Sequence, residues 1–121
     1  MKSVIDIASE AFSTKSTYQG STFSVALIGS LDMETTPRLR VYLTQVLPEV
    51  AAGNISKVVF DTNELYLMNS SAISCLANFL KDLKKLSRPC ALTFRTNSHH
   101  TWQRRAFEPL ARLADKLATI E

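Results

Sequence analysis

Hydrophobic residues recur along this chain with two spacings, one typical of strands and one typical of helices. Apolar residues that alternate with polar ones, or that follow one another directly, predict strands at residues 3–7, 12–18, 22–29, 57–61 and 90–94. The Gln19-Gly20-Ser21 tripeptide predicts a hairpin turn between the second and third of these strands. Residues 23–28 become apolar on both faces, which is typical of a central strand covered on at least one side by helices.

Two segments between the strands carry apolar residues at helical spacing. In the first, Thr36 is a candidate N-cap, Pro37 suits the first helical position, and Gly53 is a natural end. The apolar positions of this helix are Leu39, Leu43, Val46, Leu47 and Val50. The second segment ends before residues 87–89, and its apolar stripe consists of Ile73, Leu76, Ala77, Leu80 and Leu83.

A third helix is predicted to begin near His99 and to carry the apolar residues Trp102, Ala106, Leu110 and Leu113. Pro109 lies within it and is expected to kink the helix or split it in two. Residues 117–120 fit a last short strand and a frayed helix end equally well. The pattern does not separate these two alternatives.

The order of these elements predicts the fold class. Strands come first, and helices and strands then alternate to the end of the chain, which implies a sheet with parallel crossovers and helices packed against it. A chain of 121 residues has the length of one domain and buries a core without metals or disulfides. We therefore expect a single α/β domain over residues 1–121, with a mixed sheet.

Charge and hydropathy exclude several classes of function. The net charge is only +3, and acidic and basic residues are interleaved, so the chain does not indicate a nucleic-acid partner. No apolar stretch approaches the roughly 20 residues that span a bilayer, so membrane insertion is not expected. Asp6 and Glu10 interrupt any signal-peptide core, which predicts a cytoplasmic protein. Cys75 and Cys90 are expected to be buried free thiols, and no zinc-type spacing or other metal site is present.

The candidate functional site is the junction Asn69-Ser70-Ser71-Ala72. It follows the strand at 57–61 and a short predicted loop at 64–68, and it opens the second helix. A hydroxyl pair at such a position either caps the helix or accepts a phosphate whose charge switches a surface. Free N–H groups and the dipole at a helix start favour negative charge, so the local fold would tolerate a phosphate on Ser70.

Three segments together resemble the STAS family, the sulfate transporter and anti-sigma factor antagonist domains, and the likeness runs from about Phe23 to Ile120. These segments are Gly29-Ser30-Leu31-Asp32 followed by Thr35-Thr36, then Val58-Val59-Phe60-Asp61 with Leu67-Met68-Asn69-Ser70-Ser71-Ala72, and finally Arg104-Arg105-Ala106-Phe107-Glu108. They are similar to the family's Gly-x-Leu-Asp turn, its strand-acid-loop with Asp-Ser-Ser-Gly, and its last helix. The resemblance implies a SpoIIAA-like fold.

The resemblance also implies a function. In anti-sigma factor antagonists of this family, a partner kinase phosphorylates the first serine of the pair, which here is Ser70. The implied protein is a non-catalytic switch that binds an anti-sigma factor or related serine kinase, with a PP2C-type phosphatase as a further partner and no cofactor. The partner-binding residues would be Ser70 with its neighbours at the same rim, which are Asp32, Asp61, Asn69, Ser71 and Ala72.

Two positions differ from the family pattern and motivate other hypotheses. Asn69 stands where the family usually has Asp, and Ala72 stands where it usually has Gly. The first alternative is therefore an unswitched STAS binding subunit of a transporter or signalling complex. A second alternative is a domain that binds a small ligand or nucleotide at a rim of Asp32, Asp61 and Ser70. A purely structural interpretation is also open: both aspartates are turn or cap residues, and Ser70 or Ser71 caps the helix.

No sequence pattern indicates an enzyme. The chain has no Gly-rich phosphate loop, and Ser70 lacks the Gly-x-Ser-x-Gly elbow of a nucleophilic serine. His99 and His100 are adjacent, so on a helix they do not share a face and are not expected to chelate a metal. Arg104 and Arg105 are interpreted as part of a solvated helix face.

Overall fold

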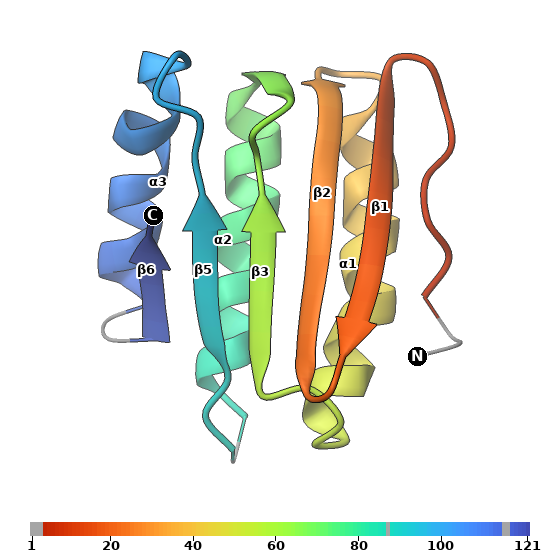
Figure 1. Ribbon diagram of the computed structural model, residues 1–121, viewed down its shortest axis with the longest axis vertical. Helices are drawn as coiled ribbons and strands as arrows, with labels where there is room; N and C mark the ends of the chain where they lie inside the picture. The colour runs from red at the N-terminus through yellow and green to blue at the C-terminus, as the bar shows by residue number, and fades with distance from the viewer. Residues whose placement is uncertain (1–3, 87, 115–116) are drawn as a thin grey trace.

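Three helices cover one face of a twisted β-sheet, and the other face of the sheet is open to solvent (Figure 1). The computed structural model describes residues 4–86, 88–114 and 117–121. In these residues the helices are α1 (Thr36–Ala51), α2 (Ser70–Lys84) and α3 (Thr101–Leu113). The strands are β1 (Phe12–Gln19), β2 (Thr22–Leu31), β3 (Lys57–Asp61), β4 (Leu65–Met68), β5 (Ala91–Arg95) and β6 (Ala118–Ile120).

The sheet is mixed, as the element order predicts. The strands lie in the order β1-β2-β3-β5-β6, and β4 pairs with β2 outside this path. Only the hairpin partner β1 is antiparallel to its neighbour, whereas the pairs β2·β3, β2·β4, β3·β5 and β5·β6 are all parallel. The predicted α/β class with helices packed against a mixed sheet is therefore confirmed.

The core lies between the sheet and the helices and is rich in aromatic rings. Phe60 on β3 stacks on Phe94 of β5 at 5.8 Å between ring centroids and meets Phe79 of α2 edge-on at 5.9 Å. Phe94 in turn stacks on Phe107 of α3 at 4.5 Å. This aromatic row joins two strands to two helices, so burial of apolar area holds the layers together.

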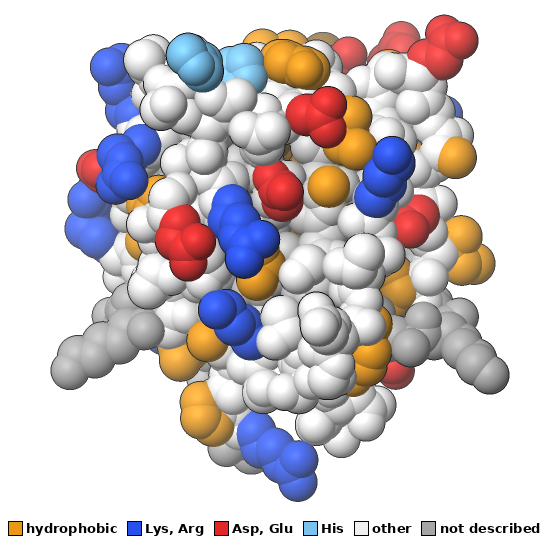
Figure 2. All heavy atoms as spheres, viewed as in Figure 1, with side chains coloured by type: hydrophobic (Ala, Val, Ile, Leu, Met, Phe, Trp, Pro, Cys, Tyr) orange, Lys and Arg blue, Asp and Glu red, His pale blue; other side chains and the backbone are white. Residues whose placement is uncertain are grey.

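The opposite face of the sheet is polar. Phe60 faces the helices, so its strand neighbours point the other way. The register places Lys15, Ala26, Asp61 and Arg95 in one row across four strands. Figure 2 views this face and shows Lys, Arg, Asp and Glu side chains interspersed among uncharged groups. A one-sided core of this kind explains why the residues of β2 alternate between buried and partly exposed positions.

Two predicted elements near the sheet are different in the structure. Residues 4–7 form no strand, because only the Thr14 N–H to Ile7 carbonyl bond joins their backbone to β1; residue 3 lies outside the described residues. Side chains hold this segment instead, and Asp6 accepts hydrogen bonds from Thr14 and Ser16. The predicted loop at 64–68 is largely the strand β4, which extends the sheet beside the end of β2.

The helix ends also differ in detail from the sequence predictions. Thr36 is the first residue of α1, and the capping position is Thr35. Pro109 lies inside α3, which continues past it to Leu113 and is not split. Residues 118–120 form strand β6, which decides between the two alternatives for the last segment. The α2 helix ends at Lys84, and Ser87 lies outside the described residues. Both cysteines are buried free thiols, as predicted.

Candidate functional site

Strand β4 leads directly into α2, and Asn69 forms the link. The Asn69 Oδ1 atom accepts a hydrogen bond of 2.8 Å from the Ala72 N–H, so Asn69 is the N-cap of α2. The same oxygen accepts a bond of 3.1 Å from the Thr36 hydroxyl at the start of α1. One amide oxygen therefore caps one helix and joins it to the beginning of another.

Because Asn69 caps the helix, the two serines are not needed for capping. Ser70 and Ser71 are the first residues of α2, and both are exposed. Neither hydroxyl is hydrogen-bonded to another side chain or backbone group in the described part of the chain. The interpretation of Ser70 or Ser71 as the helix cap is therefore wrong. Ala72, in contrast, is fully buried, and its methyl group packs in the core.

The loop between β2 and α1 lies beside this junction. The Asn69 N–H donates to the Leu31 carbonyl at 3.0 Å, which places the end of β2 next to the start of α2. In the loop that follows, Asp32 Oδ1 accepts bonds from the N–H groups of Glu34 at 2.9 Å and Thr35 at 3.0 Å. Hydrogen bonds from the Thr35 and Glu34 backbone lower the pKa of Asp32, so it is ionised at neutral pH. Asp32 thus organises the neighbouring loop.

Gly29 on β2 shows why the predicted Gly-x-Leu-Asp turn begins with glycine. Its φ of +110° is one that residues with a side chain rarely adopt, and a Cβ there would lie 2.3 Å from the Ala11 carbonyl oxygen. The Ser30 N–H donates to the same oxygen, at 2.9 Å. The register of β2 and β4 shifts between Gly29 and Ser30. The glycine therefore lets β4 join the sheet and deliver Asn69 and Ser70 to the rim.

Three large apolar side chains are exposed on the segments around the serines. Met33 in the β2–α1 loop is 87% exposed, and Tyr66 and Leu67 on β4 are 57% and 51% exposed. We refer to Met33, Tyr66, Leu67, Ser70 and Ser71 as the junction surface. Sequence reasoning missed Tyr66 and Leu67 because it predicted a loop at residues 64–68, where an exposed Tyr-Leu pair carries no periodic signal. Large exposed apolar side chains of this kind are candidates for contact with a protein partner.

A buried glutamine holds the loops behind the junction surface. Gln103 of α3 is fully buried, and its Nε2 donates to the carbonyls of Thr62 at 2.7 Å and Leu65 at 2.9 Å. Its Oε1 accepts from the Asn97 N–H at 2.8 Å and the Thr62 hydroxyl at 3.2 Å. Sequence analysis predicted the helix around 99–113 but not the role of Gln103, since one polar residue on an apolar face carries little signal. Gln103 fixes the β3–β4 loop to α3.

Asp61 does not lie on the same face as Ser70. It ends β3 on the helix-free side of the sheet, in a hollow lined also by Lys15, Lys57 and Arg95. Its Oδ1 accepts a bond of 3.0 Å from the Asn63 N–H, as expected of a turn residue. Of the predicted partner-binding residues, the structure thus brings together Asp32, Asn69, Ser70, Ser71 and Ala72 around one helix start. Binding of a partner at these residues stays a prediction.

Among the described residues, no cluster of three or more His, Cys, Asp or Glu side chains could hold a metal ion. No helix in that part of the chain is long and apolar enough to cross a membrane. The ring of His100 meets Tyr66 edge-on at 5.2 Å between centroids.

Comparison with known proteins identifies the family. A family model described as STAS domain matches residues 15–119. The fold is similar to that of an anti-sigma factor antagonist from Mycobacterium paratuberculosis, with a TM-score of 0.63 and 20% identity over 87% of this chain and 84% of that one. It is also similar to Bacillus SpoIIAA in the phosphorylated form, with a TM-score of 0.60 and 15% identity over 92% of this chain and 91% of that one. No curated protein sequence matches the chain.

Proposed function

Because the chain belongs to the STAS domain family, we propose that it is a non-catalytic regulatory protein controlled by phosphorylation of Ser70. Its partner is an anti-sigma factor or a related serine kinase, and a PP2C-type phosphatase restores the unmodified form. The protein would act in the cytoplasm, where ATP is available to the kinase. The similar folds support the proposal, since the Mycobacterium paratuberculosis protein is an anti-sigma factor antagonist and one SpoIIAA structure is of a phosphorylated form.

The observation that carries the proposal is the exposed Ser70 hydroxyl. Asn69 supplies the helix cap, so Ser70 can accept a phosphoryl group without loss of a structural hydrogen bond. The first turn of α2 contains no acidic residue that would repel the new charge. Free N–H groups and the helix dipole at this end favour an anion. The fold therefore tolerates phosphorylation of Ser70, and the added charge acts on a partner that binds at the start of α2.

A phosphate on Ser70 would change the junction surface strongly. It adds a charge of about −1.5 to −2 to a surface that also includes the exposed Leu67 and Met33. A partner that buries these apolar side chains would have to desolvate the phosphate or leave the surface. A loss of about 2–3 kcal/mol in binding free energy weakens affinity roughly 30- to 150-fold, which is sufficient for a switch.

Phosphorylation is tested directly by intact-mass analysis. The protein is incubated with ATP, Mg²⁺ and each histidine-kinase-like serine kinase encoded beside its gene. We expect one added phosphoryl group in wild type and in Ser71→Ala, and none in Ser70→Ala. The two serines are adjacent and both are exposed, so Ser71→Ala is a matched control. No mass increase in wild type, or an equal one in Ser70→Ala, would remove Ser70 from the proposal.

A second candidate is an unswitched binding subunit of a transporter or signalling complex. It is favoured by the capping amide of Asn69, which completes the α2 start without any charge. The Ser70→Asp substitution separates the two functions, with Ser71→Asp as the control for added charge. The switch predicts that Ser70→Asp weakens binding of the partner kinase in a pull-down, whereas an unswitched subunit keeps its partner in both variants.

A further inference from the structure

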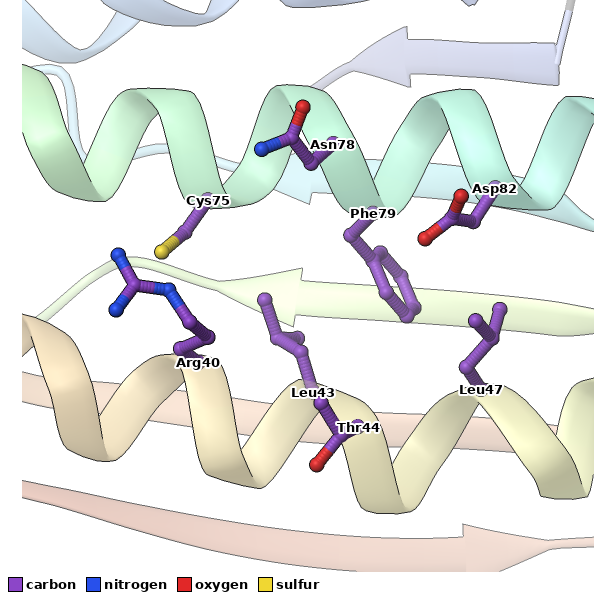
Figure 3. Close-up of a pocket in the computed structure, with 8 residues that line it drawn as sticks. All are labelled: Arg40, Leu43, Thr44, Leu47, Cys75, Asn78, Phe79 and Asp82. Carbon is purple, nitrogen blue, oxygen red and sulfur yellow. The ribbon is translucent and has the colours of Figure 1, made fainter.

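A groove of about 220 Å³ lies between α1 and α2 (Figure 3). Its apolar wall consists of Leu43 and Leu47 from α1 and the Phe79 ring from α2. Leu43 and Phe79 are 5% and 4% exposed, so their side chains belong to the core, and this part of the apolar wall is preformed. An apolar group bound in this groove would be removed from water on a preformed surface.

Opposite charges stand at the two ends of the groove. Arg40 lies at one end with Cys75, and Asp82 lies at the other end with Leu47 (Figure 3). Both helices run in the same direction because each follows a strand of the parallel part of the sheet (Figure 1). Arg40 precedes Leu47 by seven positions, and a helix rises 1.5 Å per residue, so the two ends of the groove are about 10 Å apart along α1.

Neither charge is neutralised within the described part of the chain. Arg40 and Asp82 are exposed, and no ion pair or side-chain hydrogen bond joins either of them to another described residue. A ligand with an anion at the Arg40 end and a cation at the Asp82 end would find a partner for each charge and an apolar wall between them. The reverse orientation would put like charges together at both ends.

We propose that the groove binds a small zwitterionic molecule with a carboxylate and an ammonium group joined by an apolar chain about 10 Å long. The carboxylate pairs with Arg40, the chain lies on Leu43, Phe79 and Leu47, and the ammonium group pairs with Asp82. The volume is below the roughly 300–1,000 Å³ of sites for drug-sized ligands, which fits a ligand of metabolite size. The proposal does not rest on the proposed switch at Ser70.

The proposal is tested with four probes of equal chain length on the ¹⁵N-labelled protein: ω-aminooctanoate, octanoate, octylamine and octanol. We expect ω-aminooctanoate to bind most tightly, with amide shift changes centred on Arg40, Leu43, Phe79 and Asp82. Octanoate and octylamine each retain one of the two ion pairs and bind more weakly. Octanol lacks both charges and binds weakest. No kinase or partner is needed, so the result is separate from any test of Ser70.

Charge-removing variants locate the two ends of the ligand. Arg40→Gln should weaken ω-aminooctanoate and octanoate about threefold to tenfold and leave octylamine unchanged. Asp82→Asn should weaken ω-aminooctanoate and octylamine by a similar factor and leave octanoate unchanged. Both residues are exposed, so both variants are expected to fold.

Three results would overturn the proposal. The first is the absence of shift changes with any probe up to millimolar concentration. The second is binding that is equal for all four probes or insensitive to both variants, which would show apolar adsorption only. The third is a set of shifts in the same residues that depends on protein concentration without any probe, which would assign the groove to a second copy of the chain.

Discussion

At the scale of single residues, the start of α2 divides two tasks between neighbouring side chains. Asn69 Oδ1 accepts hydrogen bonds from the Ala72 N–H and the Thr36 hydroxyl. Ser70 remains exposed and makes no structural hydrogen bond. A side chain that both capped the helix and accepted a phosphate would lose its cap on modification. The separation makes Ser70 available for modification at little cost in stability.

This division predicts different stabilities for two variants. Asn69→Ala should lower the free energy of unfolding by about 1 kcal/mol, within a range of roughly 0.5–2, because it removes the N-cap. Ser70→Ala should change it by less than about 0.5 kcal/mol, as is usual for exposed positions. Urea denaturation followed by circular dichroism measures both. If Ser70→Ala destabilises the protein as much as Asn69→Ala, then the serine carries part of the cap.

At the scale of elements, the segments that form the junction surface are held by side chains from elsewhere in the fold. Strand β4 has only four residues and lies off the main path of the sheet. Gln103 on α3 supports it by accepting or donating four hydrogen bonds to Thr62, Leu65 and Asn97. The position of the site therefore depends on a helix that follows it in sequence by about thirty residues.

Replacement of this glutamine tests the dependence. Gln103→Met keeps the length of the side chain but removes the partner of the buried Leu65 carbonyl and of the Asn97 N–H, whereas the Thr62 carbonyl keeps its hydrogen bond from the Leu65 N–H. Unsatisfied buried polar groups cost about 1–3 kcal/mol each before relaxation, so we expect a loss of about 2–4 kcal/mol in the free energy of unfolding. Arg104→Met is the control, since Arg104 is the exposed neighbour on α3 and the two residues have similar helix propensity. Equal effects of the two substitutions in urea denaturation would contradict the role of Gln103.

At the scale of the whole molecule, a single apolar layer joins all the helices to one side of the sheet. Buried residues from every helix and from all the strands belong to one hydrophobic cluster in the described residues. The Cys75 thiol on α2 and the Cys90 thiol before β5 both lie in this cluster. We propose that the chain is one cooperative domain. Because the two cysteines lie in different parts of the fold, the reactivity of their thiols can test whether these parts unfold together.

The thiols should therefore become reactive together. Burial raises the pKa of Cys90 to about 11, so at pH 8 the native protein holds little of its reactive thiolate. Pulse alkylation with iodoacetamide at increasing urea, followed by peptide mass analysis, measures each cysteine separately. We expect both labelling curves to coincide with the loss of circular dichroism. Labelling of Cys90 in urea concentrations that leave the dichroism native would show local opening and contradict a single transition.

The sequence alone determined the three helices, the hairpin, the fold class and the position of the Ser-Ser junction. These follow from local rules, because periodic apolar residues, glycine turns and strand ends are set by the backbone of a few adjacent residues. The same rules predicted the strand at 57–61, which β3 matches residue for residue. They failed at residues 4–7 and 64–68, where pairing with distant strands, and not local pattern, decides whether a short segment joins a sheet.

Only the tertiary structure decided what each junction residue does. The Thr36 hydroxyl, 33 positions away in sequence, bonds the Asn69 oxygen, so the choice of the cap involves two helices at once. Asp61 ends a strand, as predicted, but its side chain points to the open face of the sheet, because its neighbour Phe60 packs against α2. Exposure of Met33 and Leu67, the four bonds of Gln103 and the charged ends of the α1–α2 groove depend on packing between elements. Such contacts leave no periodic trace in the sequence, since they join residues that the chain itself keeps far apart.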